Sequence, residues 1–231
     1  MKLPRETAIM TLPNVTLFPQ SLLPLYIFEP RYRQMLADAL HTNRMFAVAM
    51  QKPGNSREVP MPVAGLGLVR VAVGHRDGTS HLILQGIARV ELQRAVKYKP
   101  FRIHKIRPLP TPPSDTTATD ALLEKVRELL HERIRLGLPF TFPVMPSLQP
   151  GNEAPVGPSP TLSAKEILGY LVSINEPDQA VDLVSCAVLP NASERQTILE
   201  TVDVESRLRV LIHFLVTEIR KRQKGSGSQL A

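Results

Sequence analysis

The sequence of 231 residues contains no tryptophan and a single cysteine, Cys186. One thiol can form no internal disulfide and cannot provide a cysteine-based zinc site, so nothing requires an oxidising compartment. The apolar N-terminus is broken by Pro4 and Pro13, which argues against a signal peptide. No stretch approaches the roughly 18 consecutive apolar residues of a membrane span. We therefore expect a cytoplasmic protein without a membrane partner.

Familiar catalytic and cofactor motifs are also missing. There is no phosphate-binding loop, no G-x-S-x-G nucleophile motif and no H-E-x-x-H zinc motif. Gly65 and Gly67 lack the third glycine of a dinucleotide fingerprint, and glycine in a strand more often permits close approach of another backbone. His75 and His81 flank a predicted turn, where solvated side chains are more common than a metal site. The sequence therefore predicts a protein that is not an enzyme, with no metal and no cofactor.

The charge and the prolines, in contrast, are distributed unevenly. The net charge is +7, but residues 1–110 carry 16 Lys and Arg against 6 Asp and Glu, whereas residues 111–231 carry 12 against 15. The first region is thus net +10 and the second net −3. Eleven of the 22 prolines fall in the stretches 108–114 and 138–162. We predict that the first stretch is a linker and the second an insertion.

The basic first region has the pattern of short strands. Residues 12–28 are apolar but interrupted by three prolines, which suits short extended pieces at sheet edges. Residues 30–40 carry an apolar stripe at helical spacing. Residues 63–73 alternate, with Val69, Val71 and Val73 on one face, and Asp77-Gly78 predicts a two-residue hairpin turn after them. Five or six short strands in about 100 residues favour a small barrel or sandwich.

The second region has helical periodicity with recognisable helix starts. Ser163-x-x-Glu166 and Ser193-x-x-Gln196 are capping-box patterns, and we expect Asp203 to cap the last helix. The sequence therefore predicts an α+β protein with a β-barrel over residues 1–110 and a helical bundle over residues 111–224. The bundle would carry the proline-rich insertion at 138–162, and residues 225–231 would be a disordered tail.

Two groups of residues are candidates for binding. The first is a set of large apolar side chains that could form a peptide groove, although core packing is the usual fate of such residues. It comprises Leu17, Phe18, Leu22, Leu23, Tyr26 and Phe28. The second is a run of basic residues that alternates with apolar ones, typical of a solvated strand face or a surface for phosphates or acidic peptides. It comprises Arg94, Lys97, Lys99, Arg102 and Lys105.

Three blocks of the sequence together resemble one known family. LPNVTLFP at residues 12–19 and LPLYIFEPRY at 23–32 look like the opening of the Lon protease N-terminal (substrate-binding) domain. The strands VAGLGLVRV and DGTSHLILQGIARVEL are similar to its next block, and LPNASERQTILETVDVESRLRVLIHFLVTEI to its closing helices. The resemblance covers residues 8–222, and IFEPRYR is typical of stand-alone members.

The resemblance implies a PUA-like β-barrel followed by a C-terminal α-helical bundle that recognises unfolded or flexible polypeptide. A chain of 231 residues has no room for the ATPase and protease domains of full-length Lon, so neither activity is expected. We interpret the protein as a non-enzymatic polypeptide-binding module, an adaptor or a chaperone-like holder. The alternative is an RNA-binding PUA-like protein that uses the basic face of the barrel.

Overall fold

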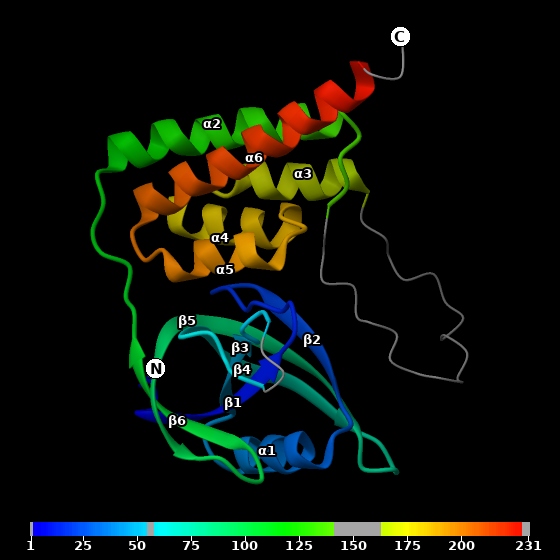
Figure 1. The fold of residues 1–231 in the computed structure, drawn as a ribbon, viewed down its shortest axis with the longest axis vertical. Helices are drawn as coiled ribbons and strands as arrows, with labels where there is room; N and C mark the ends of the chain where they lie inside the picture. The colour runs from blue at the N-terminus through cyan, green and yellow to red at the C-terminus, as the bar shows by residue number, and fades with distance from the viewer. Residues whose placement is uncertain (1, 55–57, 141–162, 228–231) are drawn as a thin grey trace. The chain divides into compact units, whose positions relative to one another are not determined.

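The computed structural model describes residues 2–54, 58–140 and 163–227 (Figure 1). The predicted insertion from residue 141 to 162, and residues 228–231 of the predicted tail, lie outside the described residues. Contacts divide the chain into a strand unit, Met1–Thr111 with Asn191–Val202, and a helical unit, Pro112–Pro190 with Asp203–Ala231. The predicted division has instead a single boundary near residue 110, with residues 191–202 among the helices.

The strand unit contains six strands and two helices. They are β1 (Glu6–Leu12), β2 (Leu22–Ile27), α1 (Pro30–His41), β3 (Met45–Met50), β4 (Val63–Gly74), β5 (Ser80–Lys97), β6 (Arg102–Pro108) and α5 (Ala192–Glu200). The strand order is β2-β5-β4-β3-β1-β6, and β6 also pairs with β5. This second pairing makes the sheet ring-like, with β2 joined only to β5. The predicted α+β class is confirmed.

Two features shape the ring: the length of β5, which pairs with three other strands, and one parallel pair among antiparallel ones. The first half of β5 pairs with both β2 and β4, and its second half, from Val90 on, pairs with β6. All pairings are antiparallel except that between β1 and β3. One face of α1 covers the core: Tyr32, Met35, Leu36 and Ala39 are buried together with Leu17 and other residues of the strands.

Two glycines of the sheet permit a close backbone approach, which the sequence predicted for Gly65 but not for Gly86. A Cβ atom on Gly65 would lie 2.0 Å from the carbonyl oxygen of Leu17, and one on Gly86 would lie 1.9 Å from that of Phe18. Gly86 also pairs with Gly67 at a register shift, so the ladder between β4 and β5 is irregular at this point. The approach places Leu17 and Phe18 in the interior, where both are fully buried.

The hairpin between β4 and β5 is one residue longer than predicted. His75 donates its backbone N–H to the carbonyl of Thr79, and Gly78, with φ of 80°, donates to the carbonyl of His75. The loop therefore has three residues, 76–78, with glycine in the left-handed conformation, which is the next most common hairpin connection after the two-residue turn. The two-residue prediction was wrong, and His75 faces Thr79 rather than Ser80.

The helical unit consists of α2 (Thr116–Arg135), α3 (Ala164–Ser173), α4 (Pro177–Val188) and α6 (Val204–Gly227). Figure 1 shows α2 alongside α6, and α4 also contacts both of them. The capping box at Ser163 and Glu166 is confirmed, and Asp203 accepts a hydrogen bond from the N–H of Ser206 at the start of α6. Residues 225–227, predicted to begin the disordered tail, are the last residues of α6.

Candidate functional site

An exposed apolar surface lies on one face of the three strands β2, β5 and β4. Alternate residues of a strand point to opposite faces of the sheet, so neighbours in register share a face. Tyr26 pairs with His81, and His81 with Val73; Pro24 pairs with Ile83, and Ile83 with Val71. We call this surface the apolar sheet face: Leu22, Pro24, Tyr26, Phe28, Val71, Val73, His81 and Ile83.

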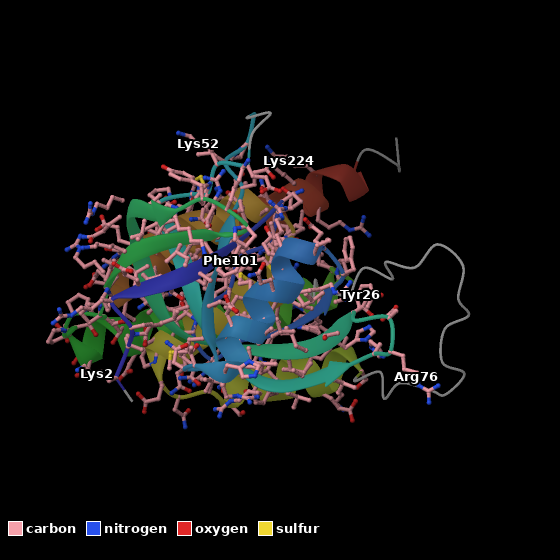
Figure 2. The ribbon with its side chains drawn as sticks, turned by 90° about the horizontal axis from the view of Figure 1, so that it is seen from below. Lys2, Tyr26, Lys52, Arg76, Phe101 and Lys224 are labelled. Atoms are coloured by element: carbon pink, nitrogen blue, oxygen red, sulfur yellow. The ribbon has the colours of Figure 1, made fainter. Side chains whose placement is uncertain are left out.

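The large side chains of the apolar sheet face are unusually exposed. The exposed fractions are 56% for Leu22, 47% for Phe28, 52% for Val71 and 53% for Val73. The Tyr26 ring lies 5.8 Å from that of Phe28 and 4.7 Å from that of His81, between centroids. Figure 2 shows Tyr26 near the end of the β4–β5 hairpin that carries Arg76. The face therefore offers an aromatic cluster bordered by aliphatic side chains.

The structure separates the six predicted groove residues into two sets. Leu17, Phe18 and Leu23 belong to the core, since they are at most 6% exposed. Leu22, Tyr26 and Phe28 lie on the opposite side of the backbone and are available to a ligand. The same alternation that buries Leu23 and Ile27 therefore exposes their neighbours.

Sequence reasoning missed the part of the apolar sheet face that β4 provides. Uniform alternation placed Val69, Val71 and Val73 on one face, but the register shifts between Val69 and Val71. This irregularity leaves Val69 1% exposed in the core and turns Val71 and Val73 outward. A bulge moves all later side chains to the other face, and no residue of this stretch signals it in advance.

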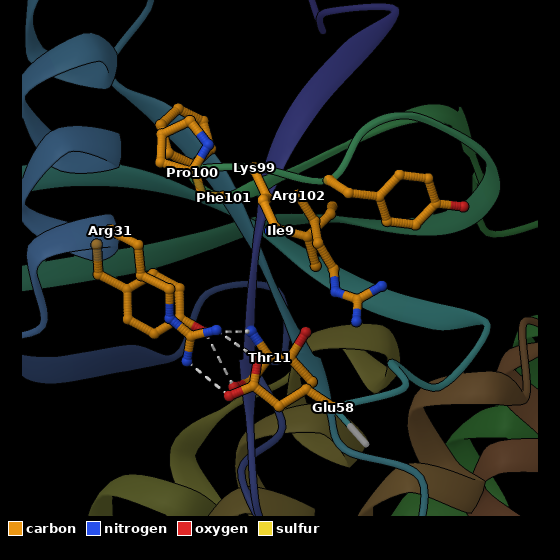
Figure 3. Close-up of a pocket in the computed structure, with 10 residues that line it drawn as sticks. Ile9, Thr11, Arg31, Glu58, Lys99, Pro100, Phe101 and Arg102 are labelled. Carbon is orange, nitrogen blue, oxygen red and sulfur yellow. Dashed lines mark hydrogen bonds and ion pairs between the residues drawn. The ribbon is translucent and has the colours of Figure 1, made fainter.

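A second surface feature of the strand unit is a pocket with a volume of about 650 Å³. It lies between β1, the first turn of α1 and the connection from β5 to β6 (Figure 3). We call it the Arg31 pocket. Its lining residues are Ile9, Thr11, Arg31, Tyr32, Glu58, Tyr98, Lys99, Pro100, Phe101 and Arg102.

Ion pairs order one side of the Arg31 pocket. Arg31 donates from its two Nη atoms to the two carboxylate oxygens of Glu58, at 2.5 and 2.6 Å (Figure 3). Its Nε donates to Glu29 at 2.9 Å. The hydrogen bond from Arg31 is the main cause that lowers the pKa of Glu58, with a further contribution from the charge of Arg102. Glu58 in turn raises the pKa of Arg31. Both side chains are therefore charged at every physiological pH.

The neighbouring Tyr32 connects α1 to β1 beneath this ion pair. The Tyr32 hydroxyl donates to the carbonyl oxygen of Thr11 and accepts from its N–H, each at 3.3 Å. The guanidinium of Arg31 lies 4.4 Å from the centre of the Tyr32 ring, within cation–π range. Burial is the main cause that raises the pKa of Tyr32, so the phenol stays neutral. These contacts fix the position of Arg31 relative to β1.

The structure brings only part of the predicted basic face to this pocket. Lys99 and Arg102 line it, and Lys97 lies 5.6 Å above the ring of Phe101, another lining residue. Arg94 is exposed and Lys105 half-buried, and neither lines the pocket. Arg94 and Lys105 therefore lie outside this pocket, and a basic binding face that includes them stays a prediction.

Other kinds of site find no support in the part of the chain that the structure describes. Within residues 2–54, 58–140 and 163–227, no three His, Cys, Asp or Glu residues gather so that they could hold a metal ion. None of the helices in those same ranges has the length and apolar character to cross a membrane.

Known proteins resemble the chain along nearly its whole length. The family model described as the ATP-dependent protease La (LON) substrate-binding domain matches residues 6–217. The Lon protease of Desulfosudis oleivorans is 24% identical over 99% of this chain and 26% of its own length. The Lon protease of Dictyoglomus thermophilum is 24% identical over 94% of this chain and 25% of its own length. The chain thus spans about a quarter of the length of these curated relatives.

Solved structures show the same fold at lower sequence identity. The N-terminal domain of Mycobacterium avium complex Lon protease superposes with a TM-score of 0.66 at 18% identity, covering 91% of this chain and 98% of that one. The Lon N-terminal domain protein from Xanthomonas campestris gives a TM-score of 0.55 at 18% identity, covering 90% and 97%. Both matches cover nearly all of the compared domain.

Proposed function

Because the chain belongs to the ATP-dependent protease La (LON) substrate-binding domain family, we propose that it is a non-enzymatic module that binds unfolded or flexible polypeptide. The description of the family names substrate binding, and the curated relatives that this chain matches are Lon proteases. In this proposal the protein is an adaptor or a chaperone-like holder. It binds the polypeptide and does not cleave it.

The observation that supports this proposal is the apolar sheet face. Leu22, Phe28, Val71 and Val73 expose about half of their surface or more on one side of three adjoining strands. Contiguous exposed apolar surface on a soluble domain marks a binding site, because it costs free energy to keep it hydrated. Unfolded chains share exposed apolar side chains as their common feature, so such a face binds them without reading a defined sequence.

The test is binding of reduced casein, an unfolded model protein, measured by fluorescence anisotropy of labelled casein. The double variant Leu22→Ser with Phe28→Ser removes two large side chains of the apolar sheet face. We expect its affinity to fall about tenfold or more, because full burial of each such side chain contributes about 1.5–3 kcal/mol and a loss of about 1.4 kcal/mol corresponds to tenfold.

The matched control is Tyr170→Ser, which removes a side chain that is 61% exposed on α3 in the helical unit. Its affinity for casein should stay that of the wild-type protein. Absence of casein binding at micromolar concentration contradicts the proposal, as does an equal loss in the control.

RNA binding is the second candidate, and the exposed side chains of Arg94, Lys97 and Lys99 support it. Phosphate contacts release counterions, so affinity for RNA would fall steeply as salt rises. Charge reversal at Lys97 and Lys99 would abolish this binding and leave casein binding on the apolar sheet face intact. Absence of RNA binding at low salt rules the candidate out.

A further inference from the structure

The Arg31 pocket contains more positive than negative charge. Among the described residues, its lining includes Arg31, Lys99 and Arg102 but a single carboxylate, that of Glu58. Arg31 is already engaged by both oxygens of Glu58 and by Glu29. The charge of Glu58 is therefore taken up mainly by Arg31 and to a smaller extent by Arg102, so the described lining keeps a net positive charge for a ligand.

Arg102 is the cation best placed to receive an anionic group. Its guanidinium lies 5.7 Å from the ring centre of Tyr98, which is itself 65% exposed at the pocket. No carboxylate among the described residues forms an ion pair with it. Its planar fork of donors suits two-point binding of a carboxylate, which a lysine does not provide.

A buried hydroxyl in the same pocket lacks a hydrogen-bond partner. Thr11 is 4% exposed, and its Oγ1 atom bonds to no described residue although its backbone N–H and carbonyl both bond to Tyr32. Figure 3 shows Thr11 beside the Arg31–Glu58 pair. Leaving a buried hydroxyl without a hydrogen-bond partner costs free energy. A ligand oxygen that accepts a hydrogen bond from this hydroxyl would recover that free energy.

The other described residues that line the pocket are mainly apolar or aromatic. Ile9, Tyr98, Pro100 and Phe101 line it, and the volume of about 650 Å³ exceeds what one carboxyl group fills. The pocket thus combines a carboxylate-binding arginine and a hydroxyl donor with a surface for hydrophobic side chains. A ligand that matches it carries negative charge next to apolar groups.

We infer that the Arg31 pocket is a second subsite for the polypeptide ligand and selects segments with a carboxylate next to apolar residues. The carboxylate binds Arg102 and the Thr11 hydroxyl, and the flanking apolar side chains pack on Tyr98 and Pro100. This inference rests on the proposed function. It adds a charge preference that the apolar sheet face alone cannot provide.

A single tryptophan can report on this pocket because the wild-type chain has none. In a Tyr98→Trp protein all tryptophan emission comes from the pocket wall. The probes are Leu-rich peptides amidated at the C-terminus: one contains Asp and Glu, and its neutral twin has Asn and Gln in their place. A third peptide is the neutral twin with a free C-terminal carboxylate, which separates a terminal carboxylate from a side-chain one.

We expect the acidic peptide to shift the emission of the Tyr98→Trp protein and to bind about tenfold more tightly than the neutral twin. Adding Arg102→Gln should remove this preference. The matched control Arg94→Gln makes the same change of charge outside the pocket lining and should preserve it. If the free C-terminus restores tight binding to the neutral twin, the carboxylate is a terminal one.

Thr11→Val is a second variant that leaves the charge unchanged. It replaces the unpartnered hydroxyl by a methyl group of similar size in a strand, so we expect no loss of stability. Affinity for the acidic peptide should nevertheless fall about threefold to tenfold. A purely structural role of Thr11 would not weaken binding while the free energy of unfolding is preserved.

Three results overturn the inference. They are equal affinity for the acidic and neutral peptides, an unchanged preference in Arg102→Gln, or an equal loss in Arg94→Gln, which would indicate diffuse attraction of polyanions such as RNA. Binding of labelled casein to the wild-type protein, followed by fluorescence anisotropy, distinguishes this failure from failure of the proposed function. If the protein binds casein, only the pocket inference fails; if neither casein nor any peptide binds, both fail.

Discussion

At the scale of single residues, glycine allows the backbone around residue 17 to pass close to β4 and β5. Leu17 and Phe18 are fully buried because β4 and β5 present glycine where the backbone of these two residues passes. A side chain at Gly86 would meet the backbone of Phe18, which cannot move aside as a flexible side chain can. The sequence predicted the close approach from glycine in a strand, but not which segment makes it.

Gly86→Ala should therefore destabilise the protein by about 2–4 kcal/mol, because the added methyl group overlaps backbone atoms in a packed core. Gly169→Ala is the control with the opposite sign. Gly169 lies inside α3 with no atom within 4 Å of the added Cβ, so alanine should stabilise by about 0.5–1 kcal/mol. Urea unfolding followed by circular dichroism measures both. Equal effects of the two substitutions would contradict this explanation.

At the scale of elements, the sequence predicted well which segments are helices or strands, but poorly how neighbouring strands pair residue by residue. The capping box of α3 and the start of α1 at Pro30 could be recognised, since each depends on residues that are adjacent in the chain. The bulge near Val71 could not, because it depends on how β4 pairs with β5. This is also why half of the apolar sheet face was missed: its β4 part exists only because of that bulge.

The start of α5 shows how two adjacent signals compete. Ser193 and Gln196 have the spacing of a capping box, but the N-cap is Asn191, whose side chain accepts from the N–H of Ser193. Gln196 is buried and donates to the carbonyl of Val63 and to Glu200. The capping box predicted here was wrong because the amide of Gln196 is used in a tertiary contact within the strand unit.

Substitutions at α5 can separate the two helix starts. Asn191→Ala should lower the free energy of unfolding by about 1 kcal/mol, the usual cost of losing an N-cap side chain. Ser193→Ala, on the same exposed turn, should change it by less than about 0.5 kcal/mol. Thermal unfolding of both variants under one buffer condition is sufficient. A larger effect at Ser193 would restore the capping box that the sequence indicated.

At the scale of the whole molecule, the buried charged residues are the feature that the sequence predicted least well. Charged residues are almost never fully buried unless paired, so no pattern in the sequence placed a charged residue in the interior. Arg133 and Arg207 are nevertheless at most 1% exposed, in the helical unit. Arg133 pairs with Glu218, 85 residues away, and Arg207 with Asp182, 25 residues away. Such pairs depend on helix packing, which periodicity within each helix does not reveal.

Arg207 gives the sharpest test of how the helical unit is held together. It joins α6 to α4 through Asp182, at 2.7 Å, and through the half-exposed Asp178. Arg207→Met leaves the buried carboxylate of Asp182 without its guanidinium, so we expect a loss of about 3–5 kcal/mol in unfolding free energy. Adding Asp182→Leu removes that isolated charge and should recover most of the loss, since an apolar pair of similar volume often replaces a buried ion pair.

The matched control for Arg207 is Arg209→Met on the same helix. Arg209 is 62% exposed and pairs with Glu205 one turn earlier, so its loss should cost less than about 0.5 kcal/mol. Circular dichroism reports chiefly on helices, and emission of the Tyr98→Trp protein reports on the strand unit. Because contacts divide the chain into two compact units, Arg207→Met should lower the unfolding midpoint seen by circular dichroism more than the midpoint seen by tryptophan emission. If the double variant is no more stable than Arg207→Met alone, the buried charge is not what the arginine compensates.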